Sequence, residues 1–210
     1  MAPPHTLRRE HLATIQHNLL TTSELHEPKG IDSATAGQVY FADGAGSGQW
    51  ATWPSGWGHY VHTGQLNVDI TPSLLQINGL GSNTNTTYLP KDATEDLWNT
   101  ATNRIRPVAL GDSYTVRVNL PVTGEVNNPR EISLILDIQD GNSFVDAIPI
   151  TQSFALTGRT TPYTYSINFT IFALNTFVAN GGQFWLATDS HSVTITDPSI
   201  LINRTHGPAV

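Results

Sequence analysis

The sequence of 210 residues contains no cysteine and only two lysines, Lys29 and Lys91. The absence of cysteine excludes a disulfide framework and a thiolate metal site. Charged residues make up 13% of the chain, about half the share found in an ordinary globular domain. Networks of salt bridges therefore cannot hold this fold together, and its stability must come from packing, hydrogen bonding or assembly.

Basic residues and long apolar runs are also scarce. The formal charge of −7 and the sequence pI near 5.5 disfavour nucleic-acid binding, because that affinity comes mainly from Lys and Arg. No segment approaches the roughly 18 apolar residues of a membrane span, and the first residues lack the apolar run of a signal peptide. We therefore expect a protein made in the cytoplasm that binds neither nucleic acid nor membrane.

One segment, residues 6–20, has the apolar spacing of a helix. Thr6 can cap its start, and Leu12, Ile15 and Leu19 recur at helical spacing. A short helix with so narrow an apolar stripe has little reason to fold alone. Two interpretations stay open: the helix rests against another chain, or it is a frayed terminal helix packed on its own domain.

Beyond residue 107 the apolar period changes to two. Within residues 162–172, Tyr, Ile and Phe at every second position from 163 to 171 alternate with Thr, Ser and Asn, which predicts a half-buried strand. The same reasoning predicts strands at 113–120, 131–138, 183–188, 192–196 and 199–203. Turn signals such as Asn180-Gly181-Gly182 and Asp197-Pro198 separate them, with no helix expected between them. This pattern predicts an all-β protein, an antiparallel jelly-roll sandwich.

The middle of the chain is less regular. Residues 58–70 predict one or two strands, and residues 92–98 predict a single helical turn. No internal repeat is present, which argues against a long fibre shaft.

The stretch ADGAGSGQW at 42–50 raises the question of a phosphate loop. No Gly-Lys-Ser/Thr ends it and no amphipathic helix follows, so a nucleotide site is excluded. Ser47 does not lie in the G-x-S-x-G frame of a hydrolase nucleophile. Glycine here allows a tight turn and close approach of backbones. The predicted hinge or turn positions are Gly30, Gly44, Gly46 and Gly48.

Aromatic residues crowd around this stretch. They are Tyr40, Phe41, Trp50, Trp53, Trp57 and Tyr60. Such rings can form a stacking platform for sugars or the anchors of a subunit interface. Only Asp43 and Gln49 supply a carboxylate or amide between them. We therefore favour an interface or core role over a sugar site.

Candidates for catalysis and metal binding have simpler explanations. His59 and His62 lie in an extended segment, where residues three apart face opposite sides. Asp137, Asp140 and Asp146 could suggest the paired carboxylates of a glycoside hydrolase. However, Asp140 lies in an Asp-Gly-Asn turn and Asp137 on the expected polar side of its strand. We expect no enzyme activity, no cofactor and no metal site.

The segment from His26 to Trp50 resembles one near the start of small virion proteins of tailed bacteriophages. The pattern is H-x-P-K-G followed by A-x-x-x-V-Y-x-A-D-G-x-G-S-G-x-W. The matching residues are His26, Pro28, Lys29, Gly30, Ala36, Val39, Tyr40, Ala42, Asp43, Gly44, Gly46, Ser47, Gly48 and Trp50. The later part, from Asn180 to Asn203, is similar to the trimeric jelly rolls, of the tumour-necrosis-factor type, of phage decoration proteins and head fibres.

These resemblances imply two domains: a helix and extended attachment arm at 1–50, and a jelly roll at 51–210. They imply a homotrimer on the outer capsid surface of a virion, with the major capsid protein as partner. The expected anchors for the capsid or the trimer are Leu12, Ile15, Leu19, Tyr40, Phe41, Trp50 and Trp53. The alternative is a head-fibre or tail-fibre tip that recognises host surface polysaccharide.

Overall fold

The computed structural model describes residues 34–36, 38–42, 48–52, 55–80, 88–90, 93–124, 131–138, 147–150 and 162–206. The chain divides into two compact units, Met1–Ala51 and Thr52–Val210. The first contains the two-stranded sheet of β1 (Gln38–Ala42) and β2 (Gly48–Thr52), except for Thr52, the last residue of β2. The helix predicted at 6–20 lies outside the described residues.

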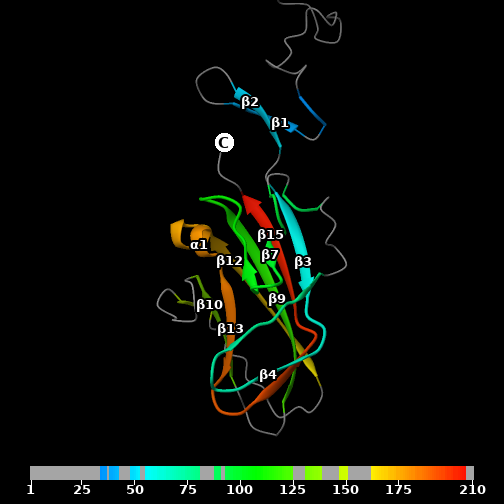
Figure 1. Ribbon diagram of the computed structural model, residues 1–210, viewed down its shortest axis with the longest axis vertical. Helices are drawn as coiled ribbons and strands as arrows, with labels where there is room; N and C mark the ends of the chain where they lie inside the picture. The colour runs from blue at the N-terminus through cyan, green and yellow to red at the C-terminus, as the bar shows by residue number, and fades with distance from the viewer. Residues whose placement is uncertain are drawn as a thin grey trace, which may run out of the picture. The chain divides into compact units, whose positions relative to one another are not determined.

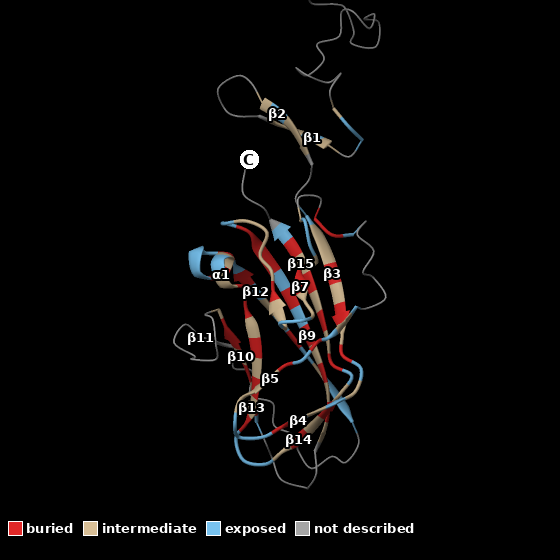
Figure 2. Ribbon diagram, in the orientation of Figure 1, coloured by how far each residue is buried: buried red, intermediate tan, exposed pale blue. Residues whose placement is uncertain are grey.

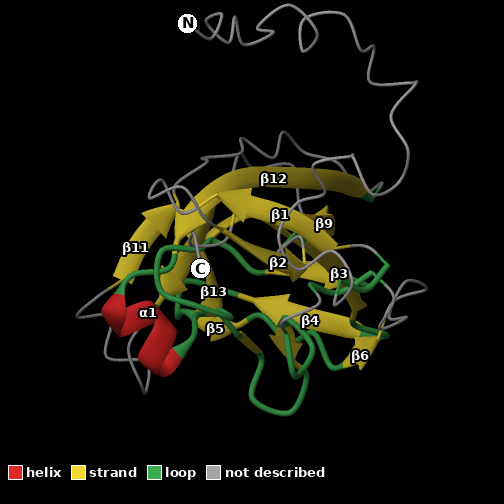
Figure 3. Cartoon of the chain, turned by 90° about the horizontal axis from the view of Figure 1, so that it is seen from above, coloured by secondary structure: helices red, strands yellow, loops and turns green. Residues whose placement is uncertain are grey.

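The second unit is built on a larger sheet that runs along its length (Figure 1). Its strand order is β4-β14-β9-β15-β3-β6, and β12 pairs with the other side of β9. The bounds are β3 (Gly56–Val61), β4 (Gln65–Val68), β6 (Gly79–Leu80), β9 (Ser113–Gly124), β12 (Tyr163–Phe172), β14 (Val193–Thr196) and β15 (Ser199–His206). β12 and β6 lie at opposite edges of this sheet (Figure 3).

A smaller sheet packs against it. Its order is β11-β10-β13-β5. The bounds are β5 (Ser73–Leu74), β10 (Ile132–Asp137), β11 (Ala147–Ile150) and β13 (Gln183–Thr188). A further hairpin joins β7 (Trp98–Asn99) to β8 (Arg104–Ile105). The pairings in both sheets are antiparallel, and the predicted antiparallel jelly-roll sandwich is confirmed.

Alternation along the strands decides which side chains enter the sandwich. In β9 every second residue from Tyr114 to Val122 is buried, while Thr115 and Arg117 between them are exposed. Burial follows the strands as alternating bands (Figure 2). The period of two read from the sequence is therefore the consequence of one face meeting the other sheet and one face meeting solvent.

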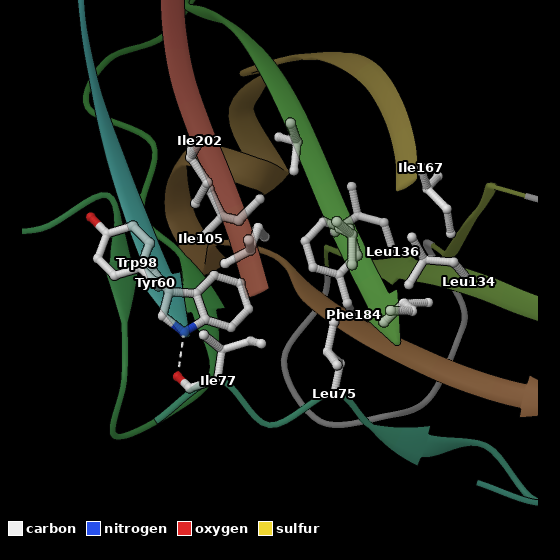
Figure 4. Close-up of a cluster of buried hydrophobic side chains, with 14 of the residues drawn as sticks. Tyr60, Leu75, Ile77, Trp98, Ile105, Leu134, Leu136, Ile167, Phe184 and Ile202 are labelled. Carbon is white, nitrogen blue, oxygen red and sulfur yellow. Dashed lines mark hydrogen bonds between the residues drawn. The ribbon is translucent and has the colours of Figure 1, made fainter. Parts of the chain in front are cut away.

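Large aromatic rings fill the space between the sheets (Figure 4). Trp98 stacks nearly parallel to Phe184 with ring centroids 6.2 Å apart, and its Nε1 donates to the carbonyl of Ile77 at 2.8 Å. Tyr60 is fully buried, and its ring lies back over Gly58, where an added Cβ would stand 2.7 Å from the ring carbon Cζ. A side chain at position 58 therefore cannot coexist with the present position of the Tyr60 ring.

A paired corner bends the larger sheet where β3 passes into β4 and β14 into β15. Gly64 and Asp197 both have positive φ, +126° and +50°. The Gly64 N–H donates to Asp197 Oδ1 at 2.8 Å, the Asp197 N–H donates to the Gly64 carbonyl at 2.9 Å, and the His62 N–H donates to the Pro198 carbonyl at 2.9 Å. The two bends thus satisfy each other's backbone groups.

Three local predictions are wrong. The helix α1 (Asn175–Asn180) stands between β12 and β13, where none was expected. It has no side-chain cap hydrogen bond and no acidic residue in its first turn, so it carries none of the usual start signals. Residues 93–97 form bends, with no helical turn, because Leu97 and Trp98 lead into the core. Asp137 is fully buried, although its face of β10 was expected to be polar.

Candidate interaction surfaces

The β1–β2 hairpin brings two predicted anchors together. Tyr40 and Trp50 meet edge to face, with ring centroids 5.4 Å apart and planes at 63°. Both are half-buried, as is Phe41. Because successive residues of a strand face opposite sides, Val39 and Phe41 lie on the other face from Tyr40. Each face of this small sheet therefore carries apolar side chains.

Gly48 is required by this arrangement. A Cβ at Gly48 would collide with the carbonyl oxygen of Phe41 and lie 2.8 Å from the ring carbon Cζ of Tyr40. The backbone and the Tyr40 ring occupy the space that a side chain would need. Glycine at position 48 therefore allows the backbone of β2 to approach Phe41 and Tyr40 of β1 closely. Gly30, Gly44 and Gly46 lie outside the described residues, as do Leu12, Ile15, Leu19 and Trp53.

Two strands of five residues each are too small to bury a core. An isolated two-stranded hairpin is at best marginally stable in water. Its aromatic side chains stabilise the hairpin only when another surface covers them. The hairpin thus has the composition of a docking element.

The outer face of the larger sheet has a different chemistry. Neighbouring strands align its side chains in rows: Trp57, Asn203, Thr115 and Thr170 in one, His59, Leu201, Arg117 and Asn168 in the next, and Val61, Ser199, Asn119 and Ser166 in the third. The third row is a hydrogen-bonded ladder, in which Ser166 donates to Asn119 Oδ1 at 2.7 Å and Asn119 donates to Ser199 Oγ at 3.0 Å. These rows contain no carboxylate, although the chain carries a net charge of −7.

The basic groups on this face influence each other. Desolvation lowers the pKa of His59, and the neighbouring Arg117 guanidinium lowers it further. Both causes disfavour the imidazolium. His59 therefore stays neutral to lower pH than an ordinary histidine.

An aromatic pair lies at one border of the same face. Trp57 stacks on Tyr88 with ring centroids 5.2 Å apart and planes at 26°. The backbone N–H of Trp57 also donates to the backbone carbonyl of Tyr88 at 2.7 Å. Tyr88 is 48% exposed. The pair is held by backbone as well as by stacking, so it presents a fixed aromatic surface beside the amide of Asn203, which pairs with Trp57.

A buried ion pair supports one end of the sheet, and sequence reasoning missed it. Arg204 Nη2 lies 2.6 Å from Asp112 Oδ1, and both side chains are almost inaccessible, at 1% and 0%. Asp112 Oδ2 accepts from the Tyr114 hydroxyl at 2.5 Å and from the Ala109 N–H at 2.8 Å. Burial raises the pKa of Tyr114 far above its usual range, and its hydrogen bond to Asp112 raises it further. The phenol therefore remains a donor to the carboxylate.

The described residues contain no group of three or more His, Asp or Glu placed to hold a metal ion. In the same part of the chain no helix is long and apolar enough to cross a membrane. Of the candidate carboxylates, Asp140 and Asp146 lie outside the described residues. Asp137 pairs in register with Gln183 and Ala147 inside the smaller sheet.

The class defined by these strands is an antiparallel jelly-roll sandwich. No family model matches the chain, and no curated protein matches it. Among solved structures it is similar to Eiger TNF from S. frugiperda, with 12% identity and a TM-score of 0.49, covering 75% of this chain and 97% of that one.

Two viral structures are also similar. PRD1 vertex protein P5 has 11% identity and a TM-score of 0.43, covering 82% of this chain and 84% of that chain. The infectious bursal disease virus Gx strain structure has 12% identity and a TM-score of 0.35, covering 80% of this chain and 38% of that one. Likenesses this distant indicate no function, and the fold assignment rests on strand order and register.

Proposed function

We propose that this chain is a virion structural protein of tailed bacteriophages, a non-enzymatic homotrimer that binds the outer surface of the head and stabilises it. The observation that carries the proposal is the β1–β2 hairpin. It lies in the segment that resembles phage virion proteins, and Gly48 lets Tyr40 pack against Trp50 there. A hairpin this small with apolar residues on both faces is best explained as part of an interface.

In this proposal the two units have different roles. Residues 1–50 attach to the major capsid protein, and the jelly roll is displayed. Binding only to the assembled shell stabilises that shell by RT ln(1 + [L]/Kd). Three arms on one trimer raise the effective concentration of each arm, so individually weak contacts give firm attachment. Adjacent capsomers are thereby cemented together.

We assign self-association to the outer face of the larger sheet. Copies of an acidic protein repel each other wherever carboxylates meet, and the three rows described above contain none. Trp57 and Leu201 supply apolar area on this face, and hydroxyls and amides supply hydrogen bonds. This composition suits a contact between copies of this chain.

Co-sedimentation with expanded capsids that lack this protein tests the proposal. The full chain is expected to bind, and a chain of residues 52–210 is expected to remain in the supernatant. Trp50→Ala should weaken binding by about 2 kcal/mol, roughly 30-fold. Gln49→Ala is the matched control, because Gln49 is exposed on the same strand. Equal binding by the full chain, the truncated chain and Trp50→Ala would refute an attachment role for this segment.

A second candidate function is recognition of host surface polysaccharide at a fibre tip. The stacked Trp57–Tyr88 pair favours it, because an exposed aromatic surface beside the Asn203 amide can stack on a sugar ring and hydrogen-bond its hydroxyls. Titration with host polysaccharide would then change tryptophan fluorescence, and Tyr88→Ala would abolish the change. An unchanged spectrum across the titration would exclude this candidate.

A further inference from the structure

Three exposed apolar side chains gather at one end of the sandwich. They are Leu110, Phe172 and Leu174, which are 53%, 66% and 67% exposed; we call them the end patch. The Gly111 N–H donates to the Ala173 carbonyl and the Ala173 N–H donates to the Asp112 carbonyl, each at 2.8 Å. These bonds hold the two segments of the patch side by side. Single exposed apolar residues need no explanation, whereas three of them on neighbouring segments point to an interaction site.

Neighbouring buried residues fix the backbone that carries the end patch. Asp112, the next residue but one after Leu110, is fixed by the buried ion pair with Arg204. Leu174 is the N-cap residue of α1, whose Phe177 is buried in the core. A surface presented by fixed backbone loses little conformational entropy when it is covered.

The two segments that carry the end patch contain no charged residue of their own. Residues 160–188 contain no Asp, Glu, Lys, Arg or His, although the whole chain has 17 acidic, 10 basic and 8 histidine residues. Residues 108–111 contain none either. In an acidic protein, these two uncharged segments reduce the repulsion that a negatively charged partner would meet.

The end patch lies at the end of the sheet where the chain enters the sandwich. Gly56, the first residue of β3, pairs with Arg204, Arg204 pairs with Tyr114, and Tyr114 pairs with Ile171, which adjoins Phe172. The start of β3, the arrowhead of β15 and α1 lie toward this end (Figure 1). Chain connectivity therefore keeps a partner held by residues 1–50 within reach of this end.

We infer that the end patch is a second contact with the capsid protein, filled by an apolar, uncharged surface of the assembled shell. This inference rests on the proposed attachment of residues 1–50 and names what the jelly roll itself adds to it. Residues 1–50 bind the shell first, and the end patch then binds the shell through the sandwich. Two linked contacts on one chain bind far more tightly than either alone.

The test measures capsid affinity by co-sedimentation for Phe172→Ser and Leu174→Ser. Serine is a preferred N-cap residue, so the second variant keeps α1 intact. Each variant is expected to lose about tenfold in affinity, with its thermal midpoint and native mass unchanged. The loss should be the same at about 50 and about 500 mM NaCl, because no charge is involved. Ile70→Ser is the matched control, since Ile70 is 63% exposed beyond β4, away from the end patch.

The outcomes separate this inference from the proposal beneath it. Unchanged affinity in both end-patch variants, with Trp50→Ala still weakened, would overturn the inference and leave arm attachment standing. Failure of the unaltered chain to bind capsids would overturn both. A smaller native mass in Phe172→Ser would show that the patch joins copies of this chain, which also overturns the inference.

Discussion

The buried Asp112–Arg204 pair gives the sharpest stability prediction. Asp112→Ala removes three interactions: the 2.6 Å contact with Arg204 and the hydrogen bonds from Tyr114 and Ala109. Arg204 would keep its charge at 1% exposure without this counter-ion. Breaking a buried pair from one side costs about 3–5 kcal/mol. We expect Asp112→Ala to lower the free energy of unfolding by that amount, a large share of the roughly 5–15 kcal/mol of a whole domain.

Urea unfolding at one fixed protein concentration measures this loss, provided that the slope with denaturant stays constant. Glu95→Ala is the control, because Glu95 pairs with Arg106 at 2.8 Å while 62% exposed, and such pairs contribute at most about 1 kcal/mol. Combining Asp112→Ala with Arg204→Met should cost less than the sum of the two single changes, since the double variant buries no lone charge. A cost below about 1 kcal/mol for Asp112→Ala would refute this reasoning.

Three further predictions concern single positions. Gly48→Ala should displace the β1–β2 hairpin and abolish capsid attachment without changing the thermal midpoint of the sandwich; a lowered midpoint with intact attachment would contradict it. Gly58→Ala should destabilise the sandwich by about 1–3 kcal/mol in urea unfolding, because the new Cβ displaces the Tyr60 ring. His59 has a lowered pKa when folded because of desolvation and Arg117, so the unfolded chain binds its proton more readily and stability falls as the pH drops below about 6.5. His59→Gln should therefore show a smaller fall in thermal midpoint between pH 7.5 and pH 5 than the unaltered protein, and an equal fall would contradict the assignment.

Much of the sandwich could be predicted from the sequence because its long strands have one buried and one exposed face. Residues 162–172 alternate so regularly that the predicted strand differs from β12 (Tyr163–Phe172) only by one residue at its start. Strands of two residues, such as β7, contain no period to detect. The helix α1 was not predicted, because its N-cap residue is Leu174, which makes no side-chain cap hydrogen bond.

The candidate surfaces were less predictable. Tyr40 and Trp50 were expected as anchors, but no pattern predicted that they touch, because contact across a hairpin depends on strand register. The predicted last strand ended at Asn203, and so it excluded Arg204. Alternation through Ile200 and Ile202 continues to Arg204 and places it on the core side. Asp112, 92 positions away along the chain, meets this charged residue there and stabilises it.

The central position of β15 sets an order of events during synthesis. β15 lies between β3 and β9 and pairs with both, yet it is the last of the described strands along the chain. Until translation has passed about residue 206, β3 and β9 each present an open edge that no earlier strand can fill. Open edges pair readily with other chains. Neighbouring nascent chains on one messenger are thus at risk of pairing with each other, and late insertion of β15 closes both edges in a single step.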